Sequence, residues 1–135
     1  MNFRNFNKGH VFIFCVYLIG FSVGTISHTI DIGRSGFLGY TFAPMILNLF
    51  WTSLVLIDPL VIFCLFTSFR FAINLAIVVM ALDIFINLAF GLFSHHKPVL
   101  FGLITQIPFG IFVLVTSRLM IQKKTFREFL FSNND

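Results

Sequence analysis

Apolar residues gather in four long runs along the chain, separated by short connections. The runs extend over Val11 to Ile30, Met45 to Phe66, Ala72 to Phe93 and Val99 to Ile121. Each is about the ~20 residues that a helix needs to cross the ~30 Å hydrocarbon core of a bilayer. The longest connection, 31–44, holds three glycines and a proline, which favour turns. The pattern predicts an all-α protein, a four-helix transmembrane bundle that forms a single domain over 1–135.

The composition excludes an ordinary soluble domain. Hydrophobic residues make up 58% of the 135-residue chain and charged residues 10%, with a mean hydropathy of +0.96. A chain so apolar and so poor in charge belongs largely inside lipid. The first run also continues for about twenty residues without a clear small-x-small cleavage site, so we expect an uncleaved anchor rather than a secretory signal.

Basic residues are distributed unevenly between the two ends of the predicted helices. Seven fall near the N-terminus, in the second connection or toward the C-terminus: Arg4, Lys8, Arg70, Arg118, Lys123, Lys124 and Arg127. The first and third connections hold only Arg34 and Lys97. This bias predicts that both termini are cytoplasmic, in an inner or plasma membrane, with a basic tail at 122–135. The basic residues are too few and too dispersed to indicate a nucleic-acid partner, although the net charge is +4.

Two acidic residues lie near the middle of apolar runs. Asp58 is in the second run and Asp83 is in the third. A carboxyl group at the centre of a spanning helix costs roughly 2.5–3.5 kcal/mol on insertion scales, so such groups face a protein interior and have partners. Asp58 precedes Pro59, and we expect the second helix to bend there and free a backbone carbonyl near the acid.

Other polar residues share a helix face with these acids, at the roughly 100° spacing of successive helical residues. Together they predict a polar pocket that opens outward. Its expected lining is His28, Asp31, Asn48, Trp51, Asp58, Asp83, Asn87 and Gln106.

Each of these residue types suggests a role in binding. Asp58 and Asp83 would bind a cation or titrate, and Trp51 would stack against the ligand. The amides of Asn48, Asn87 and Gln106 would orient it. Asp83 and Asn87 also form an i, i+4 pair whose side chains can hydrogen-bond.

Small residues on the first helix indicate a close packing contact. Gly20 and Gly24 form a small-xxx-small pair, which lets another helix approach closely. We expect this face to support homodimerisation, because four short helices enclose little volume by themselves. Cys15 and Cys64 are interpreted as packing residues, and no cofactor is predicted.

Three hypotheses for function remain open. The first is binding or transport of a small solute or cation. The second is a non-catalytic membrane subunit, chaperone or immunity-type protein whose polar faces meet a partner, with the two acids holding helices together. The third is an acid-base membrane enzyme acting on a lipid-like substrate, with His28, Asp31 and Asp83 moving protons. A metal site from His28, Asp31, His95 and His96 has suitable chemistry but little support from spacing, since the last two are adjacent.

Two stretches resemble a known group of proteins. They are HTIDIGRSGFLGYTFAPMILNLFWTSLVLIDPL, from His28 to Leu60, and ALDIFINLAF in the third run. The chain is similar there to small four-span bacterial membrane proteins without an assigned activity. The resemblance covers roughly the first three helices. It implies a four-span fold and carries no function across.

Overall fold

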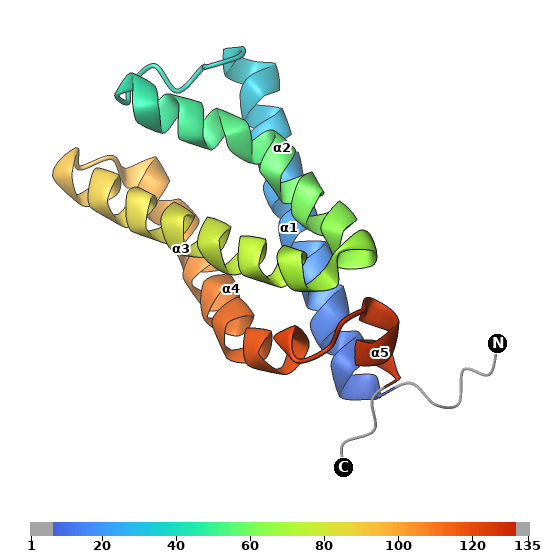
Figure 1. Cartoon of the computed structure of the whole chain (residues 1–135). Coiled ribbons are helices and arrows are strands. Elements are labelled where there is room, and N and C mark those ends of the chain that lie inside the picture. Colours follow the sequence, from blue (N-terminus) through green and yellow to red (C-terminus); the bar gives the residue numbers. More distant parts are fainter. Residues whose placement is uncertain (1–6, 132–135) are drawn as a thin grey trace.

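The computed structural model describes residues 7–131, and this part of the chain contains helices and no strands (Figure 1). The helices are α1 (Lys8–Ser35), α2 (Met45–Thr67), α3 (Phe69–Phe93), α4 (Lys97–Ile121) and α5 (Phe126–Leu130). The first four are long and apolar enough to cross a membrane. The predicted all-α fold with four candidate spans is therefore confirmed, and the molecule is a multi-pass membrane protein.

Some helix boundaries differ from those predicted from hydropathy. Helix α1 continues beyond Ile30 to Ser35, so the polar residues that follow the apolar run are also helical. Gly36 ends it with a φ of 84°, in the left-handed region that favours glycine. Helix α2 ends at Thr67, and a single residue, Ser68, separates it from α3. Arg70, expected in a connection, therefore lies in the first turn of α3.

Two prolines lie inside helices without ending them. Pro59 is inside α2 and Pro108 is inside α4. Each lacks a backbone N–H, which leaves the carbonyl four residues earlier, at Val55 or Ile104, without its usual helical donor. Figure 1 shows α2 changing direction about midway along its length, as expected for a helix that contains proline.

The four long helices form two antiparallel hairpins, α1–α2 and α3–α4. The hairpins join mainly through α2 and α3, whereas α1 and α4 contact each other little. Both ends of the described chain lie at the same end of the bundle, where α5 packs beside the start of α1 (Figure 1). We call this the terminal end. The opposite end, which carries the α1–α2 and α3–α4 connections, is the loop end.

Aromatic side chains close the terminal end. The Phe129 ring of α5 is fully buried and stacks on His10, with ring centroids 4.4 Å apart. His10 Nδ1 also lies 2.8 Å from the Phe129 carbonyl oxygen. Phe126 packs against Phe14 and Phe66, at centroid distances of 6.0 and 5.4 Å. Part of the predicted tail at 122–135 is thus a short helix docked on the bundle.

Helices α1 and α4 meet in the half of the bundle nearest the terminal end. The Tyr17 hydroxyl donates to the Val113 carbonyl over 3.0 Å and accepts from the Thr116 hydroxyl over 3.3 Å. Phe21 packs edge-on against Phe109, with ring centroids 5.4 Å apart. These contacts tie the two hairpins together along the side opposite the α2–α3 interface.

Candidate binding cavity

A cavity of about 760 Å³ lies between the two hairpins. All four long helices and both loop-end connections contribute to its lining. Seven of the predicted pocket residues are among the lining residues: His28, Asp31, Trp51, Asp58, Asp83, Asn87 and Gln106. The structure therefore brings these seven side chains to one cavity. That they bind a ligand stays a prediction.

A hydrogen-bonded network connects three helices at the cavity wall, with Asn87 at its centre. The Asn87 Nδ2 donates to Asp83 Oδ1 over 3.0 Å and to Gln106 Oε1 over 2.8 Å. Its Oδ1 accepts from Trp51 Nε1 over 2.8 Å. Because these groups are buried or half-buried, such mutual hydrogen bonds offset the cost of removing them from water. The predicted i, i+4 contact between Asp83 and Asn87 is present.

Asp58 has a different environment from Asp83. Its side chain is buried and lines the cavity, yet within residues 7–131 it has no hydrogen-bond partner. Gly24 of α1 faces it, and a Cβ at that position would clash with the Asp58 carboxyl group. The missing side chain of Gly24 therefore makes the space that this carboxyl group occupies. An acid without an internal partner in such a place is a candidate for ligand binding.

The two predicted packing glycines both face the inside of their own chain. A Cβ at Gly20 would clash with the ring of Phe109 from α4, as one at Gly24 would clash with Asp58 from α2. The close approach that they permit is thus already used within the monomer. Dimerisation stays a prediction.

Tyr40 joins the α1–α2 connection to the end of α1. Its hydroxyl donates to Asp31 Oδ2 over 2.9 Å and lies 3.2 Å from His28 Nδ1. Burial and the neighbouring Asp31 carboxylate both disfavour the phenolate, so they raise the pKa of Tyr40 above its ordinary value. The sequence pattern did not single out Tyr40 as a cavity residue. Its position depends on the path of a connection, which periodicity does not describe.

Asn48 is the predicted pocket residue that does not line the cavity. It is buried beneath the α1–α2 connection, where its Nδ2 donates to the Leu38 carbonyl over 2.7 Å. Its Oδ1 accepts from the Tyr40 backbone N–H over 3.2 Å. Leu38 has a positive φ of 58°, which is uncommon for a residue other than glycine. Asn48 therefore holds this turn in place. That it orients a ligand stays a prediction.

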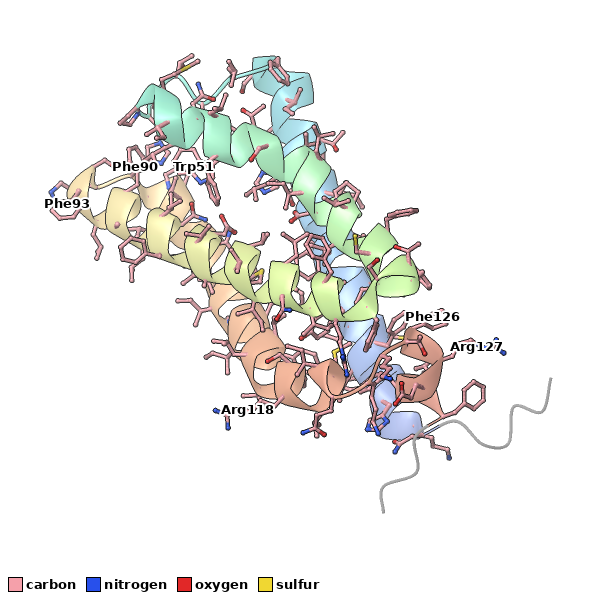
Figure 2. All side chains as sticks on the ribbon, viewed as in Figure 1. Trp51, Phe90, Phe93, Arg118, Phe126 and Arg127 are labelled. Carbon is pink, nitrogen blue, oxygen red and sulfur yellow. The ribbon has the colours of Figure 1, made fainter. Side chains whose placement is uncertain are left out.

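Aromatic rings cover the loop end between the hairpins. Phe42 stacks on His96, with centroids 4.2 Å apart and an interplanar angle of 7°. Trp51 packs against Tyr40 and Phe90, each at a centroid distance of 5.4 Å. Figure 2 shows Trp51 and Phe90 close together where α2 faces α3. The ring of Trp51, expected to stack against a ligand, is already engaged by these neighbours.

The exposed part of the cavity lining comes mostly from α1 and α4. Every lining residue of α2 and α3 is buried, including Asp58 and Asp83. The exposed lining residues are Ile19, Val23, Ser27, Ser35, Phe42, Pro98 and Thr105. Ser35, Phe42 and Pro98 lie at the loop end, and the other four lie along α1 and α4. That the cavity opens outward stays a prediction.

The other expectations for this region concern metals. Among the described residues, no group of three or more His, Cys, Asp or Glu side chains is placed to hold a metal ion. His28 and Asp31 both contact the Tyr40 hydroxyl, and His95 is outside the cavity lining. The arrangement therefore brings carboxyl and amide groups to the cavity without assembling a metal centre from them.

Comparison with protein-family models, with curated proteins and with solved structures finds no match to this chain. The resemblance to small four-span bacterial proteins accordingly stays a prediction.

Proposed function

We propose that this protein binds a small cationic solute in the cavity between its two hairpins. The observation that carries the proposal is the charge of the lining. Three of the five acidic residues of the chain line the cavity: Asp31, Asp58 and Asp83. None of the Lys or Arg residues within 7–131 does so. A cavity with this bias attracts cations and repels anions.

The carboxyl groups of Asp58 and Asp83 give the proposal its chemistry. Both line the same buried space, so they repel each other when both are ionised. A bound cation offsets that repulsion and supplies the partner that Asp58 lacks. Asn87 and Gln106 support the site, because they hold Asp83 in one orientation through the hydrogen-bonded network.

The proposal includes an orientation in the membrane. Six described basic residues lie on the terminal side of the bundle: Lys8, Arg70, Arg118, Lys123, Lys124 and Arg127. Arg34 and Lys97 lie at the loop end. The positive-inside rule then assigns the terminal end to the cytoplasm of an inner or plasma membrane.

Transport would require more than binding. The terminal half of the bundle is closed by the Tyr17–Val113 hydrogen bond and by the aromatic packing around α5. A solute that crosses the membrane would need these contacts to break while the contacts at the loop end form. The cavity therefore supports binding as the first function, with transport as a further step.

Thermal unfolding of the purified protein with Na⁺, K⁺ or ethylammonium chloride tests the proposal. We expect at least one cation to raise Tm, because a ligand that binds only the folded state stabilises it by about 2.7 kcal/mol at 100 times its Kd. The shift should disappear in Asp58→Asn and in Asp83→Asn. It should remain in Glu128→Gln, which removes an exposed acid on α5. A cation shift of equal size in Asp58→Asn would contradict the proposal.

Acidification gives a second test of the same site. Protons compete with a cation for carboxylates, so the cation-dependent gain in Tm should shrink as the pH falls. The titratable groups that line the cavity are His28, Asp31, Tyr40, Asp58, Asp83 and His96. If Asp58 and Asp83 carry the effect, the two Asn variants should show no cation-dependent gain at any pH.

A second candidate is a membrane subunit or chaperone, and the separation of α1 from α4 favours it. A helix of a partner protein would then occupy the lateral opening. In that case the purified protein alone should show no cation shift, and Asp58→Asn should reduce recovery of a defined partner in co-purification.

A further inference from the structure

We infer that the ligand is an amphiphilic amine, with one ammonium group and an apolar chain, that reaches the cavity from the bilayer between α1 and α4. This inference rests on the proposed cation site and adds its ligand class and its route of access.

The route follows from where the cavity is closed. Phe42 and His96 stack across the loop end, and Phe129 closes the terminal end. Along the sides, α1 packs on α2, α2 packs on α3, and α3 packs on α4. The α1–α4 side is held together by Tyr17 and Phe21 near the terminal end. Beyond them, Val23 and Ser27 of α1 and Thr105 of α4 line the cavity and are exposed. A ligand in the membrane therefore meets the cavity directly at the depth of the apolar helices.

The rim of this opening is apolar on the α1 side. Ile19 and Val23 line the cavity and are also 63% and 57% exposed. Both therefore face lipid and cavity at once. A hydrophilic cation such as Na⁺ would have to leave its water to pass them, whereas an alkyl chain would remain in apolar surroundings along the whole path.

Behind the rim the lining becomes polar over a short distance. Gly24 lies one residue beyond Val23 and faces the Asp58 carboxyl group. An ammonium group that passes Val23 thus meets Asp58 next to a position without a side chain. The apolar chain would remain beside Ile19 and Val23. The arrangement places a carboxylate for the head of an amine and an apolar surface for its chain.

The size of the cavity agrees with this class of ligand. Small-molecule sites have volumes of about 300–1,000 Å³ and are mostly apolar with a few well-placed polar groups. The cavity volume of about 760 Å³ lies within that range. Its apolar lining on the buried side includes Leu54, Val79 and Met80, which are available to an alkyl or aryl group.

The protein provides its own reporter for a test. Trp51 is the only tryptophan of the chain and lines the cavity. We would record its emission in nanodiscs of a zwitterionic lipid while adding octylammonium, ethylammonium or octan-1-ol. The rim variant is Val23→Phe, and its matched control is Ile26→Phe. Ile26 is 58% exposed on the same helix but does not line the cavity.

We expect octylammonium to saturate the Trp51 response at a concentration at least tenfold below that of ethylammonium, because each buried methylene favours binding by about fourfold. Octan-1-ol should produce no saturable response. Asp58→Asn should weaken octylammonium binding at least tenfold. Val23→Phe should slow the response in stopped-flow measurements at least fivefold, and Ile26→Phe should leave its rate unchanged.

Other outcomes distinguish failure of the amphiphilic-amine inference from failure of the cation site. Equal, Asp58-dependent binding of the two amines would overturn the amphiphilic ligand and leave a hydrophilic cation site. Unchanged kinetics in Val23→Phe would overturn access between α1 and α4. A response to octylammonium that is the same in Asp58→Asn, or that octan-1-ol reproduces, would overturn the cation site itself.

Discussion

The terminal and loop halves of the bundle use the same four helices in opposite ways. In the terminal half, Tyr17 and Phe21 of α1 reach Val113 and Phe109 of α4, and α5 covers the end. In the loop half, a cavity lies between the hairpins, and its lining from α1 and α4 includes Gly24, Ser27 and Gln106 beside the apolar Val23. Large aromatic side chains fill the distance between α1 and α4 in the terminal half, whereas mostly smaller side chains line the cavity in the loop half. Side-chain size thus decides which half is closed.

The largest expected effect comes from opening the closed half. Phe129→Ala removes a fully buried ring that stacks on His10, and we expect a loss of about 3 kcal/mol or more in the free energy of unfolding. Denaturant unfolding followed by circular dichroism measures this. The control is Phe37→Ala, at a position that is 76% exposed in the α1–α2 connection. An equal loss in both variants would show that α5 does not stabilise the bundle.

A smaller effect comes from filling the open half. Gly24→Leu places a side chain where the Asp58 carboxyl group lies, and overpacking of this kind costs roughly 1–3 kcal/mol. We also expect cation binding to weaken at least tenfold, because the space beside Asp58 is lost. Gly33→Leu on the same helix is the control, since a Cβ there meets nothing within 4 Å. The same Tm and cation response in both variants would contradict the assigned role of Gly24.

The two tyrosines sharpen the comparison, because one lies in each half. Tyr17→Phe removes the hydrogen bond to Val113 and should cost about 0.6 kcal/mol, a typical value for such bonds between membrane helices. It should leave cation affinity nearly unchanged. Tyr40→Phe removes the donor to Asp31 at the cavity and should change cation affinity more than stability. Unfolding curves and cation-binding curves of both variants test this. A larger loss of cation affinity in Tyr17→Phe than in Tyr40→Phe would contradict the division into halves.

The sequence predicted the spans well, because hydropathy over about twenty residues depends little on tertiary contacts. It could not predict α5. Helix α5 has five residues, which are too few for a strong periodic signal. Its position depends instead on other helices, which bury the rings of Phe126 and Phe129. The end of α1 was also missed, since Asp31 and Arg34 interrupt the apolar run without interrupting the helix.

The cavity was partly predictable for a related reason. Helical spacing places Asp58, Asp83 and Asn87 on inner faces whatever the details of packing. The place of Ile19 and Val23 in the cavity lining was not predictable, because they have the same chemistry as any residue that faces lipid. The role of Asn48 depends on the path of the α1–α2 connection, which helical periodicity does not encode.

The connection between α2 and α3 is a single residue, and a small rotation there would produce a larger displacement at the far ends of the hairpins. Ser68 lies at the terminal end, and each hairpin extends from it as an arm of 23 to 25 residues, about 35 Å at 1.5 Å per residue. A rotation of about 5° at such a joint moves the far tips by roughly 3 Å, comparable to the thickness of an aromatic ring. A small rotation near Ser68 would therefore be magnified where Phe42 meets His96.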